Sequence, residues 1–146
     1  MTNSEKTPDM GVVIGIDYGA ARIGVARINT LVKIGEPLQP VTEKDQSSSI
    51  EAILNAANDQ NADSIVVGLP RGLDGQETQQ TNDCREFAEK LQTETKTPVY
   101  IIDEAGSSEV AKSRISKKKP QSIDSMAAVV IVEDFVNFKD KQTLKV

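Results

Sequence analysis

Short runs of apolar residues recur along the chain and predict the strands of a sheet. The first two runs are joined through the short connection Gly19-Ala20-Ala21, which predicts a hairpin. The next segment is less apolar and predicts a weaker strand, whereas the last two runs are rich in β-branched residues, as buried strands are. The five expected strands are residues 12–17, 23–29, 33–37, 64–68 and 98–103.

Apolar residues at helical spacing predict the helices. Cys84, Phe87, Ala88 and Leu91 recur at intervals of three or four residues, which places them on one helical face. The spacing from Ser48 to Glu51 is that of a capping box and predicts the start of an earlier helix. The apolar face expected for the last helix consists of Ile123, Met126, Ala127, Val130 and Ile131. The expected helices are residues 48–58, 76–93, a short one from Ser107 or Ser108 to about 115, and one after Ser122.

The order of these elements predicts an α/β fold. Antiparallel strands come first and strands then alternate with helices, which favours a mixed sheet with helices on both faces. The chain of 146 residues is long enough for one domain with a real core. We expect a disordered polar tail at residues 1–10, the domain at 11–138 and a polar C-terminal tail at 139–146.

The amino-acid composition narrows the possible chemistry. The chain has no histidine and a single cysteine, Cys84, which excludes histidine-based catalysis, histidine-bound zinc and intramolecular disulfides. An enzyme of this composition would rely on carboxylates, lysine, hydroxyls or a hard cation such as Mg²⁺ or Mn²⁺. The sequence shows neither a signal peptide nor a long apolar run, so we expect a cytoplasmic protein that does not contact a membrane.

The net charge of −5 does not favour general binding to nucleic acid, because such affinity comes largely from cations. The charge is unevenly distributed, however. Residues 111–120 contain five cations and no acid. This run is either a solvated basic loop or a local contact for phosphate.

Three carboxylates occupy positions that suggest a site. Asp17 ends an apolar strand and has Gly15 and Gly19 near it, and a charge at such a position is costly unless a cation compensates it. Glu104 follows the last expected strand, and Asp124 lies in the first turn of the last helix. Taken singly, Glu104 could mark a strand exit and Asp124 a favourable helix start. Together they predict a divalent metal, because clustered carboxylates repel one another without one.

The segment from Gly15 to Ala26 resembles the opening motif of the YqgF/RuvX family. Further segments match the family in the same order, so the resemblance extends over residues 11–136. These segments are Ile65-Val66-Val67-Gly68-Leu69-Pro70 with Asp74-Gly75, Phe87-Ala88-Glu89-Lys90-Leu91, Pro98-Val99 leading to Asp103-Glu104, and Asp124-Ser125-Met126-Ala127-Ala128-Val129-Val130-Ile131.

The resemblance implies an RNase H-like fold with five strands, the second antiparallel to the rest. It also implies a metal-dependent nuclease site, with the family's acidic positions at Asp17, Glu104 and Asp124. We expect these catalytic residues to hold two Mg²⁺ or Mn²⁺ ions. The family is described both as a Holliday junction resolvase and as an endonuclease that matures the 5′ end of 16S rRNA. The expected partner is therefore structured RNA or branched DNA, bound by a monomer or a homodimer. The candidate substrate-binding residues are Gly19, Arg22, Ser107, Ser108 and Lys119.

Several cations of the family pattern are missing from this chain. Ala20 and Ala21 stand before Arg22 where the family has an acidic or polar residue and a lysine, and Ala105 stands where it has an arginine. An RNase H-like protein that binds without cleaving is therefore one alternative. An ATPase lobe of the sugar-kinase or actin type is another, although such proteins need two lobes. The glycines are too widely spaced for a dinucleotide-binding motif.

Overall fold

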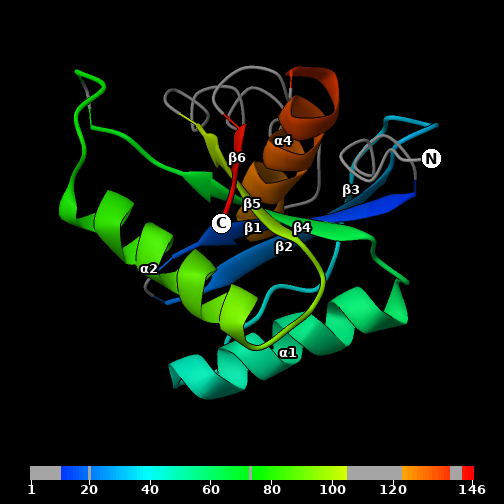
Figure 1. The fold of residues 1–146 in the computed structure, drawn as a ribbon, viewed down its shortest axis with the longest axis horizontal. Helices are drawn as coiled ribbons and strands as arrows, with labels where there is room; N and C mark the ends of the chain where they lie inside the picture. The colour runs from blue at the N-terminus through cyan, green and yellow to red at the C-terminus, as the bar shows by residue number, and fades with distance from the viewer. Residues whose placement is uncertain (1–10, 20, 73, 105–122, 139–142) are drawn as a thin grey trace.

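A six-stranded mixed sheet forms the centre of the fold (Figure 1). The computed structural model describes residues 11–19, 21–72, 74–104, 123–138 and 143–146. Within them the strand order is β3-β2-β1-β4-β5-β6, in which β1, β4 and β5 are parallel and β2 is antiparallel to β1. The strands are β1 (Val12–Tyr18), β2 (Ile23–Asn29), β3 (Glu36–Pro37), β4 (Ser64–Leu69), β5 (Val99–Asp103) and β6 (Thr143–Lys145).

The expected α/β fold and the antiparallel second strand are confirmed, and the strand count needs one correction. The structure has six strands where five were expected, because β6 lies in the segment interpreted as a polar C-terminal tail. This strand pairs with β5 at the edge of the sheet, and Leu144 on it is exposed. A strand held mainly by backbone pairing needs little apolar alternation, so its sequence carries only a weak signal.

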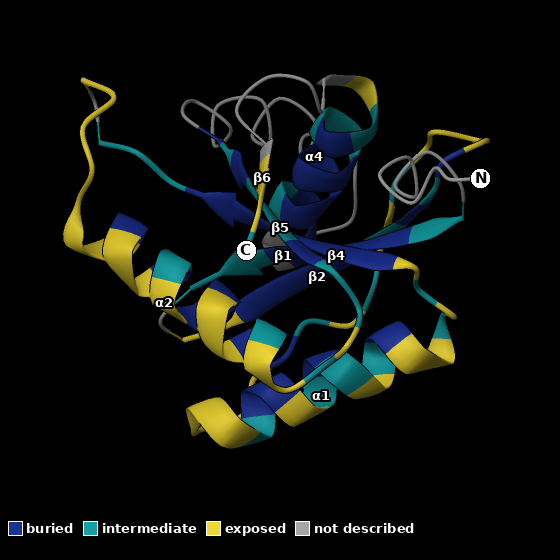
Figure 2. Cartoon of the chain, viewed as in Figure 1, coloured by how far each residue is buried: buried dark blue, intermediate teal, exposed yellow. Residues whose placement is uncertain are grey.

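Helices cover both faces of the sheet (Figure 1). One face carries α4 (Ile123–Phe138), and the other carries α1 (Gln46–Asp59) and α2 (Gln79–Thr93). Each face has its own apolar core, and the outer sides of α1 and α2 are exposed (Figure 2). The buried residues of α2 include Cys84, Phe87, Ala88 and Leu91, as their spacing predicted.

The starts of α1 and α2 differ from the sequence-based expectation. Helix α1 begins after Asp45, whose side chain accepts a hydrogen bond from the Ser48 amide, so the predicted capping box from Ser48 to Glu51 is wrong. Helix α2 begins after Thr78, which forms a reciprocal capping box with Thr81. In both cases a polar side chain nearer the loop satisfies the free amides of the first turn. The short helix expected at 107–115 lies outside the described residues.

Helix α4 packs directly on the backbone of β1. A Cβ atom at Gly15 would collide with Val132 Cγ1 and would lie 3.0 Å from the carbonyl oxygen of Ala128. Gly15 therefore lets the helix approach the strand more closely than any larger residue would allow. Within the described part of the chain, none of the helices is both long and apolar enough to span a membrane.

Candidate active site

Asp17 lies near the end of β1, opposite Gly24 of β2, and is partly buried. Residues two apart on a strand point to the same face of the sheet. Gly15 lies beneath α4, so Asp17 belongs to the face that α4 covers. The strand thus brings a carboxylate to the edge of the core on the α4 side.

Glu104 follows β5 on the same face. Ile102, two residues earlier, packs in the core beneath α4, and the amide of Glu104 donates a hydrogen bond to the carbonyl oxygen of Leu69 on β4 at 3.0 Å. A Cβ atom at Gly68 would lie 3.2 Å from Glu104 Cγ and would collide with Ile131 of α4. The absence of a side chain at Gly68 therefore leaves room for Glu104 between the sheet and α4.

The carboxyl group of Glu104 is the most unusual ionisable group of the site. Glu104 is only 6% exposed, and its Oε1 atom has no hydrogen-bond partner among the described residues. Burial, followed by the charge of Asp134 and a hydrogen bond with it, raises the pKa of Glu104 to about 9, and Asp103 and Asp17 add to the effect. The site is therefore rich in negative charge and poor in water.

Asp134 is a neighbour of Glu104 that sequence analysis missed. It lies three residues after Ile131 on α4, so both residues are on the side of the helix that faces Gly68 and Glu104. Its position ten residues beyond Asp124 gave no reason to connect it with the site. The helical interval from Ile131 is the one signal that could have identified it.

The third predicted carboxylate, Asp124, lies in the first turn of α4. Its side chain is outside the described residues, but the next residue fixes the position of the helix start. Ser125 Oγ accepts a hydrogen bond from the Val25 amide at 3.3 Å and donates one to the carbonyl oxygen of Leu38 at 2.7 Å. Val25 follows Gly24, the partner of Asp17. The start of α4 therefore lies beside the strand pair that carries Asp17.

The predicted substrate-binding residues are only partly described. Gly19 and the exposed Arg22 lie in the turn between β1 and β2, and a Cβ atom at Gly19 would lie 2.7 Å from the carbonyl oxygen of Arg22. A larger residue at position 19 would thus collide with the backbone of the same turn, so the turn itself accounts for Gly19. Ser107, Ser108 and Lys119, together with the basic run at 111–120, lie outside the described residues.

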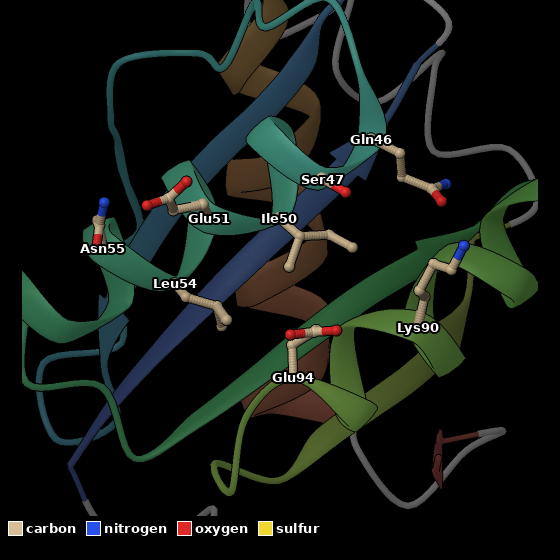
Figure 3. A pocket seen from close by; sticks show the side chains of 8 residues that line it. All are labelled: Gln46, Ser47, Ile50, Glu51, Leu54, Asn55, Lys90 and Glu94. Carbon is tan, nitrogen blue, oxygen red and sulfur yellow. The ribbon is translucent and has the colours of Figure 1, made fainter.

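Two further features are separate from this site. Burial, with the charges of Asp17 and Asp83, raises the pKa of Cys84 to about 12, so this thiol is a poor nucleophile. A hollow of about 460 Å³ lies between α1 and α2 on the opposite face of the sheet (Figure 3). Residues of α1 and α2 line it, including Ile50, Leu54 and Lys90, and neither Asp17 nor Glu104 takes part.

The carboxylates do not form a complete metal site within the described residues. There, no three histidine, cysteine, aspartate or glutamate side chains are arranged to hold a metal ion. Asp17 and Glu104 lie on the same face of the sheet, at the carboxyl ends of β1 and β5. The side chain of Asp124 is not among those described. The described part of the site thus provides two of the three predicted carboxylates, with Asp134 as an additional acid beside Glu104.

Comparisons with known proteins agree with the fold. A curated relative from Hydrogenovibrio crunogenus, named "Putative pre-16S rRNA nuclease", is 38% identical over 89% of this chain and 96% of its own. A relative of the same name from Alcanivorax borkumensis is 35% identical over 85% and 94%. The structure of T. thermophilus RuvC in complex with a Holliday junction substrate has a TM-score of 0.54 at 15% identity, covering 93% of this chain and 99% of that one.

The solved structure establishes similarity of fold alone, since its sequence identity is low, and that fold is RNase H-like, as expected. The family model described as "RuvX: Holliday junction resolvase" matches residues 11–137, nearly the whole of the domain. The match includes the positions of Asp17, Glu104 and Asp124. On this ground and on its identity to the curated relatives, the chain belongs to the RuvX family.

Proposed function

We propose that this chain is a metal-dependent endonuclease that hydrolyses phosphodiester bonds in structured nucleic acid, with the 5′ end of pre-16S rRNA as its substrate. The observation that carries the proposal is Glu104, a buried carboxyl group with one unpartnered oxygen among the described residues, located on the same face as Asp17. A buried polar atom without a partner is costly to the fold. Such an arrangement is best understood as a site prepared for a cation.

The donor set fits Mg²⁺ or Mn²⁺. Both metals prefer oxygen ligands, and the charges of Asp17, Asp103 and Asp134 around Glu104 would be partly neutralised by a cation. Asp17, Glu104 and Asp124 would hold the metal. Two ions bound there would activate a water molecule and stabilise the leaving oxygen of the cleaved phosphodiester.

Other residues of the chain would bind and orient the nucleic acid. Gly19 and Arg22 follow two and five residues after Asp17, so an exposed arginine lies close to the proposed cleavage point. Ser107, Ser108 and Lys119 are proposed as further phosphate contacts in the segment between β5 and α4. Since Ala20, Ala21 and Ala105 replace residues of the family pattern, substrate binding would depend on these few groups.

Two substrate classes have specific support. The names of the curated relatives favour pre-16S rRNA, whereas the family description and the RuvC complex favour a four-way DNA junction. The overall negative charge favours a substrate recognised by its shape at a small number of contacts. We take the rRNA precursor as the first candidate, acted on by a monomer or a homodimer.

The proposal is tested by incubating the full chain with a pre-16S rRNA transcript that retains its 5′ leader, and separately with a four-way DNA junction. Each substrate is tested with Mg²⁺, with EDTA, and with Mg²⁺ restored after EDTA. We expect cleavage of the transcript near the mature 5′ end with Mg²⁺, none with EDTA, and recovery on restoring the metal. Cleavage of the junction alone would identify a resolvase instead. Cleavage of neither substrate would support an inactive binding protein.

A further inference from the structure

The loop that follows β4 carries an arginine, Arg71, whose contacts lie directly behind the proposed site. Arg71 Nε donates a hydrogen bond to Asp103 Oδ2 at 3.1 Å, and its Nη1 lies 3.4 Å from Glu77 Oε2. The Arg71 and Asp103 side chains are 21% and 17% exposed. An ion pair this far removed from water is screened less than a surface pair, so it holds its geometry more strongly.

Asp103 connects this arginine to the carboxyl group of Glu104. The two residues are consecutive, and neighbouring side chains on a strand point to opposite faces. Arg71 therefore approaches the end of β5 from the α1/α2 side, whereas Glu104 points toward α4. The carbonyl oxygen of Leu69, two residues before Arg71, accepts the hydrogen bond of the Glu104 amide. The segment from Leu69 to Arg71 thus bonds to both Asp103 and Glu104 at the end of β5.

The same segment is anchored to helix α2. Thr81 Oγ1 donates a hydrogen bond to the carbonyl oxygen of Pro70 at 2.6 Å, and Thr81 is fully buried within the capping box with Thr78. Glu77, the second partner of Arg71, is also held by Arg85 of α2 at 3.0 Å. The loop that carries Arg71 is therefore tied to α2 on one side and to β5 on the other.

From these contacts we infer that Arg71 is a positioning residue, which fixes the end of β5 through Asp103 and so holds the Glu104 carboxyl group in place. The inference rests on the proposed nuclease function, because it assigns Arg71 to the same site. Residues that hydrogen-bond to metal ligands orient those ligands, and losing such a residue typically costs 10- to 100-fold in metal affinity or activity. Arg71 would orient Glu104 in the same sense, but through the adjacent residue Asp103. Arg71 acts from behind the carboxylate, so we expect it to affect turnover more than substrate binding.

The test compares Arg71→Met with Arg27→Met. Arg27 serves as the control because its side chain is about as exposed as that of Arg71, 24% against 21%, and it also forms an ion pair, with Glu36 at 3.2 Å. That pair lies on β2 and β3, away from β5, and its Glu36 side chain is 63% exposed. Amide hydrogen exchange of Glu104 is measured in the metal-free chain, together with kcat and KM on the pre-16S rRNA transcript. For Arg71→Met we expect exchange to accelerate roughly tenfold and kcat to fall roughly 10- to 100-fold, with KM within about twofold. Arg71→Lys should restore part of both effects, and Arg27→Met should cause neither.

The possible failures are distinguishable. If Arg71→Met raises KM and leaves kcat and the exchange of Glu104 unchanged, Arg71 contacts substrate and the inference is wrong. If both arginine variants change exchange equally, the effect is general destabilisation and the inference is equally wrong. If the wild-type chain cleaves nothing but Arg71→Met still accelerates exchange at Glu104, the positioning contact stands and the proposed nuclease function fails.

Discussion

Replacing Asp17 by asparagine is expected to reduce cleavage of the rRNA transcript by about 100-fold or more, since the loss of a direct metal ligand should cost at least as much as the loss of an outer partner. The substitution keeps the size of the side chain and its position at the end of β1. It removes the negative charge that would attract the cation. The measurement is kcat/KM with saturating Mg²⁺, accompanied by thermal unfolding to show that the variant is folded.

The matched control for this variant is Asp74→Asn. Asp74 is exposed on the loop between β4 and α2, so the same chemical change is made away from the proposed metal. We expect activity within about twofold of wild type, as is usual for surface substitutions. Cleavage that survives Asp17→Asn would contradict the assignment of Asp17 as a metal ligand.

Replacing Glu104 by glutamine is expected to abolish cleavage and, at the same time, to stabilise the metal-free fold. The pKa of Glu104 is raised to about 9 from the ordinary value of 4.5, mainly by burial. The folded chain therefore binds this proton more tightly than the unfolded chain does. The stability that the protonated group contributes is full below pH 4.5 and is lost as the pH rises toward 9. Glutamine stays neutral throughout and avoids this loss.

The expected signature is a difference in melting temperature that grows with pH. At pH 8 without divalent ions, we expect Glu104→Gln to melt roughly 3–6 °C above wild type, and the difference to be small near pH 4.5. Adding Mg²⁺ should raise the melting temperature of wild type more than that of the variant, because only wild type keeps the full ligand set. Glu51→Gln, an exposed change on α1, serves as control and should show no such trend.

Two outcomes would contradict this account of Glu104. A variant that is less stable than wild type at pH 8 would show that the ionised carboxylate is well solvated or paired in the fold. A variant that keeps its activity would show that Glu104 takes no part in the reaction. The stability and activity measurements are independent, so each part of the account is tested separately.

Much of the fold could be predicted from the sequence because the local signals agree with one another. The apolar runs of β1 and β2 are joined by a connection too short for anything but a hairpin, and they form one. The helical spacing from Cys84 to Leu91 matches the buried side of α2. Strand β6 could not be predicted, because Thr143–Lys145 is short and its single apolar residue, Leu144, is exposed, and its pairing with β5 depends on the rest of the sheet.

The placement of Asp17 and Glu104 on one face of the sheet was predictable to the extent that both lie at strand ends. Asp17 and Glu104 end apolar runs, and the carboxyl ends of parallel strands, here β1, β4 and β5, lie at the same end of the sheet. Asp134 and Arg71 could not be found in this way. Asp134 reaches Glu104 only because α4 packs across the sheet, and Arg71 reaches Asp103 only because its loop folds back onto β5. Apart from the helical interval between Ile131 and Asp134, these tertiary contacts leave no pattern in the neighbouring sequence.

The central claim is that Asp17, Glu104 and Asp124 hold divalent metal, and diffraction from crystals soaked in Mn²⁺ tests it most directly. Manganese is identified by its anomalous scattering, so the measurement does not depend on activity or on the choice of substrate. We predict anomalous density between these three carboxylates, with Glu104 oxygens as ligands. Soaked crystals that show no manganese at this edge of the sheet would contradict the claim.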